Sequence, residues 1–199
     1  MYKDFFKDVL DFYFALILLI VFSPLMIIVY LILYLSIGSP MYYQKRPGYL
    51  NKPFLIYKFK TLIDKNCKNY HPKKKIFKFG NFLRKTGIDE MPQLLNIIRG
   101  EMSFIGPRPL LMKYLKLNEF AKHPRCKCNP GITGLAQIQS NKDNKKGKWK
   151  VQLNFDKYYS KNLSIFLDTK IFLLTFVKIF LLNSKQDYLI EKPLTKKNI

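Results

Sequence analysis

Acidic residues are scarce in this chain of 199 residues, which has 13 Asp and Glu against 35 Lys and Arg and a formal net charge of +22. So large a surplus indicates an anionic partner, such as nucleic acid, lipid headgroups or nucleotide phosphates. Cysteine is also rare: the three residues form an odd set without disulfide-framework spacing, which favours a reducing compartment. Apolar residues, in contrast, make up 48% of the chain, which excludes ordinary disorder.

A long apolar run covers residues 12–35 and is interrupted only by Ser23 and Pro24. A run of roughly 20 such residues is long enough to cross the hydrocarbon layer. Proline removes a backbone donor and disfavours helical angles in the residue before it, so we expect a bend at Ser23-Pro24. Each half would be about 18 Å long, which suits a hairpin that enters and leaves by one face. A kinked single span is the alternative, since membrane helices tolerate proline.

The charge after this run predicts the topology. Residues 41–85 carry 13 Lys and Arg against the single acid Asp64, so the positive-inside rule places the downstream body in the cytoplasm. The basic run in residues 64–85 is typical of a surface attracted to anionic lipids. Nucleic-acid binding is the less favoured use beside a membrane segment, and we predict no nucleic-acid partner. We expect a membrane-inserted domain at 1–38 and a domain at the cytosolic face at 39–199.

Two strand-like segments, residues 41–44 and 53–61, flank a turn signal at 46–51 and predict a β-hairpin. Strand alternation would put Lys58 and Lys60 on one face, where two ammonium groups could clamp a phosphate. A solvated lysine face is the alternative.

The adjacent acids Asp89 and Glu90 stand at the start of a helical apolar pattern over residues 88–98. The helix dipole would favour one acid there as a simple cap, but two in so basic a chain indicate a site. A carboxylate that binds Mg²⁺ or attacks phosphorus needs cations to offset the charge of a pyrophosphate, and Lys58, Lys60 and Arg108 can supply them. Arg108 stands between two prolines and is suited to bind phosphate through its guanidinium fork.

The order of the motifs resembles the bacterial sugar transferases and, more narrowly, the small monotopic phosphoglycosyl transferases that are PglC-like. The resemblance covers nearly the whole chain. It rests on Ser23-Pro24, Arg46-Pro47-Gly48, residues 57–61 (YKFKT), residues 88–94 (IDEMPQL), residues 101–109 (EMSFIGPRP) and residues 130–134 (PGITG).

The resemblance implies transfer of a phospho-sugar from a UDP-sugar to undecaprenyl phosphate, giving undecaprenyl-diphosphate sugar and UMP, as the first membrane step of glycoconjugate assembly. Asp89 would be the nucleophile that carries a covalent phospho-sugar, with Mg²⁺ held by Asp89 and Glu90. Glu90 would assist with the metal or with proton movement. The implied substrate-binding residues are Lys58, Lys60, Thr61, Pro107, Arg108 and Asp168.

The resemblance also implies a re-entrant helix broken at Ser23-Pro24, with the protein on the cytoplasmic face of the bacterial inner membrane. The fold class expected is α+β, mainly helical, with a small β-hairpin and amphipathic interfacial helices. Residues 163–182 predict one such helix, because mid-membrane Asp168, Lys170 and Lys178 would be costly. Asp168 pairing with an active-site lysine is a further option.

The chain departs from the family pattern at Asn129, Leu135 and Ser140-Asn141, which favours a different sugar preference over lost chemistry. Two other classes of function stay open. One is a non-catalytic membrane-bound scaffold that binds sugar nucleotide or lipid, and the other is a glycosyltransferase that releases UDP.

Overall fold

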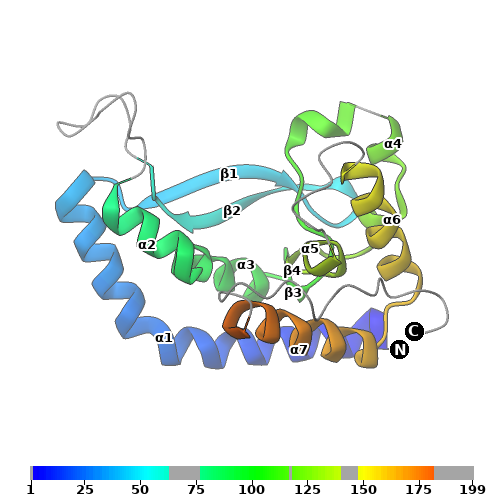
Figure 1. Ribbon diagram of the computed structural model, residues 1–199, viewed down its shortest axis with the longest axis horizontal. Coiled ribbons are helices and arrows are strands. Elements are labelled where there is room, and N and C mark those ends of the chain that lie inside the picture. The colour runs from blue at the N-terminus through cyan, green and yellow to red at the C-terminus, as the bar shows by residue number, and fades with distance from the viewer. Residues whose placement is uncertain (1, 63–76, 117, 140–147, 182–199) are drawn as a thin grey trace.

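The computed structural model describes residues 2–62, 77–116, 118–139 and 148–181, and they form a mainly helical molecule with short strands (Figure 1). This confirms the α+β class expected from the sequence. The helices are α1 (Lys7–Ile37), α2 (Lys78–Thr86), α3 (Leu94–Ile98), α4 (Asn118–Ala121), α5 (Leu135–Gln139), α6 (Lys148–Lys161) and α7 (Ile165–Leu181). The strands are β1 (Met41–Pro47), β2 (Pro53–Phe59), β3 (Ser103–Ile105) and β4 (Gly131–Thr133). Short 3-10 or π-helical segments are η1 (Tyr2–Phe6), η2 (Tyr49–Asn51), η3 (Ile88–Gln93), η4 (Met112–Lys116) and η5 (Pro124–Lys127).

Helix α1 contains Pro24 and still runs unbroken to Ile37, where Gly38 ends it at φ 70°. Pro24 has no N–H to give to the carbonyl of Ile20, four residues earlier. The Ser23 hydroxyl donates to that same carbonyl at 2.8 Å instead. The serine therefore satisfies the acceptor that the proline leaves unpaired, and the helix changes direction partway along without a gap (Figure 1).

Both halves of α1 pack on the rest of the molecule. Ala15 in the first half belongs to an apolar cluster with Phe54 and Leu94. Leu33 in the second half belongs to another with Phe59 and Leu83. Much of the remaining helix surface is apolar and exposed, and α1 is the one helix in the described residues long and apolar enough to cross a membrane.

The predicted hairpin is confirmed: β1 and β2 pair antiparallel, from Met41 opposite Phe59 to Pro47 opposite Pro53. A side chain holds the free edge of β2. The fully buried Asn96 of α3 donates to the Leu55 carbonyl at 2.7 Å and accepts from the Tyr57 N–H at 3.1 Å. Asn96 thus fixes β2 against α3, in place of a third strand.

Three glycines bring β3 and β4 together as a short parallel pair. A Cβ on Gly131 would lie 2.1 Å from the Gly106 nitrogen, and one on Gly134 would lie 2.1 Å from the Gly106 oxygen. Only glycine fits at such backbone contacts. We call Gly106, Gly131 and Gly134 the glycine contact; it fixes the chain that leads into Arg108.

Helix α7 turns Asp168, Thr175 and Lys178 toward the rest of the protein. Asp168 accepts from the Lys7 ammonium at 2.6 Å and from the Tyr159 hydroxyl at 2.7 Å, while Thr175 and Thr133 share a hydrogen bond of 2.8 Å. Lys178 donates to two carbonyls of α5. Apolar side chains of α7 are exposed instead, among them Phe166, which is 84% exposed. A helix at the surface of a water-soluble protein buries its apolar face and exposes its polar one. The reverse arrangement in α7 is the one that an interfacial helix requires, because the outer face of such a helix meets lipid.

Candidate active site

A cavity of about 590 Å³ lies between the hairpin, the end of α2, η3 and the loop after β3. It brings together six of the eight residues that the sequence analysis assigned to the site: Lys58, Lys60, Thr61, Asp89, Glu90 and Arg108. Its other lining residues include Tyr42, Gln44, Arg46 and Arg84. The roles of these residues stay predictions, but their convergence from four separate segments is what a common site requires.

The acidic pair lies in a tighter turn than the sequence suggested. Gly87 ends α2 at φ 74°, and Asp89 and Glu90 then occupy the first turn of the 3-10 helix η3, which passes into α3 only at Leu94. A continuous α-helix over 88–98 was predicted, and this was wrong in its first turn. Pro92 cannot donate to the Ile88 carbonyl, so the α-helical hydrogen-bond pattern cannot begin there.

The two acids have different electrostatic surroundings. Glu90 forms an ion pair with the Lys58 ammonium. Burial raises the pKa of Asp89 above its ordinary value, and the charge of neighbouring Glu90 adds to the effect, while Lys58 and Arg84 oppose it. Asp89 is therefore a partly desolvated carboxylate, which is a good nucleophile once it is ionised.

Two arginines in the cavity were not assigned to the site from the sequence. Arg84 donates from Nε to the Thr61 hydroxyl at 2.7 Å, and Thr61 is only 5% exposed. Arg46 donates to Gln44 at 2.6 Å and to the Pro109 carbonyl at 3.2 Å. In the sequence analysis Arg46 belonged to a turn motif and Arg84 to a basic run attributed to lipid binding. Pairing of the predicted hairpin could have placed Arg46 near Lys58, whereas nothing in the local sequence marked Arg84 as a site residue.

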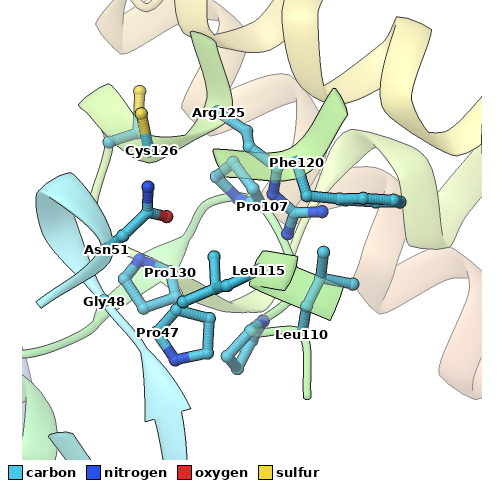
Figure 2. A pocket seen from close by; sticks show the side chains of 12 residues that line it. Pro47, Gly48, Asn51, Pro107, Leu110, Leu115, Phe120, Arg125, Cys126 and Pro130 are labelled. Carbon is cyan, nitrogen blue, oxygen red and sulfur yellow. The ribbon is translucent and has the colours of Figure 1, made fainter. Parts of the chain in front are cut away.

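The structure does not bring Pro107 to this cavity. Pro107 lines a smaller pocket with Pro47, Pro130 and Arg125, and its carbonyl accepts from the Gly131 N–H at 3.1 Å (Figure 2). Arg125 is held there by an ion pair with Asp156 at 3.0 Å and by the carbonyl of Arg108. Pro107 and Arg125 thus support the backbone of the Arg108 loop from its other side.

Asp168 also lies elsewhere. It is 4% exposed, and its carboxylate binds Lys7, Tyr159 and Tyr2. The lysine that pairs with it is Lys7 of α1, so the suggested pairing with an active-site lysine is wrong. The reason is geometric: α7 lies against the start of α1, where Lys7 is buried and needs an anion.

The acidic pair fits a magnesium ion that shares its coordination with a substrate. Among the described residues no group of three or more His, Cys, Asp or Glu could hold a metal alone. Mg²⁺ usually binds one or two carboxylates together with water and substrate phosphates, so the oxygens of Asp89 and Glu90 meet its needs when a diphosphate is present.

The comparison with known proteins decides the family. A model described as bacterial sugar transferase matches residues 2–182. The chain belongs to the bacterial sugar transferase family. It is 40% identical over 177 residues to an uncharacterized sugar transferase, EpsL, of Bacillus subtilis, covering 87% of this chain and 86% of that one. As a bacterial sugar transferase it is an enzyme of the transferase class.

Other relatives carry more specific names. The exopolysaccharide production protein ExoY of Rhizobium meliloti is 32% identical over 77% of this sugar transferase and 76% of its own length. The UDP-glucose:undecaprenyl-phosphate glucose-1-phosphate transferase of Escherichia coli is 34% identical over 85% of this chain but only 39% of its own. The match to that longer protein is thus to one part of it.

The departures from the family pattern lie away from the cavity wherever this sugar transferase is described. Leu135 is 2% exposed in an apolar cluster with Ile138 and Ile171. Asn129 lines a separate cavity of about 470 Å³ beside Lys7. Ser140 and Asn141 are outside the described residues. Neither Asn129 nor Leu135 lines the cavity of Asp89, so the structure offers no support for a sugar contact at these two positions.

Proposed function

We propose that this sugar transferase moves a phospho-sugar from a UDP-sugar to undecaprenyl phosphate, releasing UMP and leaving undecaprenyl-diphosphate sugar. The E. coli relative is named for such a transfer, and similarity alone extends it here. The observation that carries the proposal is the cavity in which Asp89 and Glu90 face Lys58, Lys60, Arg46, Arg84 and Arg108. Acids that attack or coordinate phosphate need cations around them, and this cavity supplies them.

The reaction proceeds in two displacements. In the first, a carboxylate oxygen of Asp89 attacks the β-phosphorus of the UDP-sugar, and the bond from that phosphorus to the bridging oxygen breaks, so UMP leaves with the electron pair. In the second, an oxygen of undecaprenyl phosphate attacks the same phosphorus, the bond to Asp89 breaks, and the carboxylate is regenerated. The covalent aspartyl phospho-sugar divides one difficult step between two polyanions into two.

The surrounding residues bind and neutralise charge in both steps. Lys58 holds Glu90 in place and lowers the charge beside the β-phosphate, while Arg108 and Lys60 bind phosphate oxygens. Asp89 and Glu90 would hold Mg²⁺, which supplies further neutralisation of the diphosphate when bound. Arg84, fixed by Thr61, favours the ionised form of Asp89 and so opposes part of the rise in its pKa.

The protein works at the cytoplasmic face of the bacterial inner membrane, with α1 re-entrant and α7 in the interface. The exposed apolar surfaces of α1 and α7 support membrane attachment, and the positive charge after α1 supports the cytoplasmic side.

The decisive experiment identifies the released nucleotide. Purified protein in detergent micelles is incubated with UDP-sugars, undecaprenyl phosphate and Mg²⁺, and the products are separated by chromatography. We expect UMP from the wild type and a loss of at least about 10³-fold for Asp89→Asn, because the nucleophile is removed. Intact mass after mixing with donor alone should show a phospho-sugar adduct that is absent from Asp89→Asn.

Other outcomes would reject the mechanism. Release of UDP would identify the UDP-releasing class. Undiminished UMP from Asp89→Asn would exclude Asp89 as nucleophile. Binding of UDP-sugar without turnover of any donor tested would favour the scaffold.

A further inference from the structure

A small recess of about 20 Å³ adjoins the cavity of Asp89. It shares Arg46, Lys58, Glu90 and Arg108 with that cavity, so it is a side compartment of the same site. Gln93 lines the recess but not the larger cavity. A volume of this size has room for about one water molecule or one phosphoryl oxygen.

Two buried donors at this recess have no hydrogen-bond partner among the described residues: the amide Nε2 of Gln93 and the Nε of Arg46. Gln93 is 2% exposed, so bulk water does not satisfy its amide. An unpaired buried donor costs about 1–3 kcal/mol. A recess lined by two residues with such donors is suited to an acceptor that arrives with the substrate.

The chemistry of the recess specifies that acceptor. Arg46, Lys58 and Arg108 bring three positive charges, and the one acid that lines it, Glu90, is paired with Lys58. A negatively charged oxygen therefore fits better than a neutral carbonyl or a hydroxyl. Phosphoryl oxygens are the anionic oxygens of the substrates in the proposed function.

The position of Gln93 indicates which phosphoryl group. In a 3-10 helix, residues three apart lie above one another on the same side. Gln93 follows Glu90 by three residues in η3, and both residues line the recess, so Gln93 lies on the same side of η3 as Glu90. Glu90 directly follows Asp89 in the chain and lines both compartments, so the phosphoryl group that Asp89 attacks is the one expected to place an oxygen here.

We propose that Gln93 and Arg46 together bind a non-bridging oxygen of the phosphoryl group that is transferred, the β-phosphoryl group of the UDP-sugar. This inference rests on the proposed function. These two hydrogen-bond donors do not contact the nucleoside or the α-phosphate. They therefore select the sugar-nucleotide substrate by the phosphate attached to the sugar.

The test compares UDP with UMP, which differ by the β-phosphate. Binding of each nucleotide to wild type and to Gln93→Met is measured by titration calorimetry in detergent micelles with Mg²⁺. Methionine preserves the volume of glutamine and removes the donor. We expect the affinity for UDP to fall roughly 10- to 100-fold, as for a lost hydrogen bond to a charged group, and the affinity for UMP to stay unchanged. The control Gln152→Met, on α6 outside both compartments, should change neither affinity.

A second variant protects the test against misfolding of Gln93→Met. In Gln93→Glu an ionised carboxylate would repel the phosphoryl oxygen, while a protonated one would donate to it. The UMP-release rate of this variant divided by that of wild type should therefore rise as the pH falls from 8 to 6. A purely structural defect would give a constant ratio.

The proposal is overturned if Gln93→Met weakens the binding of UDP and UMP equally or weakens neither. It is also overturned if the UMP-release rate of Gln93→Glu, divided by that of wild type, does not depend on pH. Failure of the proposed function would look different. In that case the wild type would release no UMP and would still bind UDP more tightly than UMP in a way that depends on Gln93. That result would support the phosphate-binding recess and reject the transferase mechanism.

Discussion

Lys58 contacts the acidic pair directly, through its ion pair with Glu90. It also lowers the pKa of Asp89, against the larger raising effects of burial and of the Glu90 charge. A single side chain thus holds Glu90 in place and favours the ionised form of Asp89. The protonation of Asp89 should limit activity on the acid side of the pH profile, because a protonated carboxyl does not attack phosphorus.

Substitution of Lys58 by Gln should move that limit. Removing the positive charge raises the pKa of Asp89 further, so kcat/KM for UMP release should begin to fall at a higher pH than in wild type. On the plateau at high pH we expect a loss of roughly 10- to 100-fold from weaker phosphate binding. Rates measured from pH 5 to pH 8.5 check both effects.

The matched control is Lys45→Gln, which removes one positive charge from the exposed part of β1 outside the cavity. Its acid limb should coincide with that of wild type. An identical shift in both variants would show that overall charge, and not the contact with the acidic pair, sets the pKa.

Among single residues, the sequence predicted those site residues that differ in chemistry from their neighbours in the chain. Asp89 and Glu90 are conspicuous in a basic chain, and Arg108 stands between prolines. Arg84, Asn96 and Gln93 carry no such contrast, because their importance comes from what the fold places beside them. Whether a given cation of a basic run faces a substrate or the solvent depends on the rotation of α2, which the sequence pattern did not determine.

Among the elements, the β3–β4 pair depends most strongly on a single residue type. Each strand has only three residues, and the pairing relies on backbone atoms that approach too closely for any side chain at the glycine contact. Arg108 follows β3 by three residues, so the strand pair sets the position of its guanidinium. Hairpin and helix patterns were visible in the sequence, whereas this parallel pair joins segments about 25 residues apart with no periodic signal.

Gly131→Ala should therefore damage both stability and activity. Its methyl group would lie 2.1 Å from the Gly106 backbone nitrogen, which cannot move without separating the strands. We expect a loss of about 3 kcal/mol in stability and a large loss of UMP release through displacement of Arg108. Thermal unfolding in micelles and the UMP assay measure the two effects.

Gly38→Ala is the control for backbone conformation alone. Gly38 has φ 70° but no atom within 4 Å of an added Cβ, so only the left-handed geometry is penalised, by about 1 kcal/mol. Activity should stay close to that of wild type. Equal losses in the two variants would contradict the role of the glycine contact.

For the whole molecule, the path of α1 bears on how the protein sits in a membrane. Both halves of the helix pack on the same body, one against Phe54 and Leu94 and the other against Phe59 and Leu83. A straight span would carry one half away from that body. The apolar pattern predicted the bend from Ser23-Pro24 but left hairpin and span open, because the packing partners lie in β2, α2 and α3; the family resemblance was what favoured the hairpin.

Single cysteines at positions 8 and 39, near the two ends of α1, test the re-entrant topology. With Cys67, Cys126 and Cys128 replaced by serine, both positions should react with a membrane-impermeant maleimide in inverted inner-membrane vesicles and neither in intact spheroplasts. Mass-tag gel shifts measure the labelling. If position 8 reacts from outside and position 39 from inside, α1 spans the bilayer and the proposed topology is wrong.

The packing of α1 has a consequence for how such an enzyme can be handled. The candidate membrane helix α1 also completes the interior around β2 and α3, through Ala15, Val29 and Leu33. Cutting the chain at Gly38 would not liberate a water-soluble catalyst, because it would expose the apolar clusters that α1 covers. An unrelated membrane anchor could restore attachment but would not replace the packing of α1, so the catalytic part and this helix must be expressed and purified together.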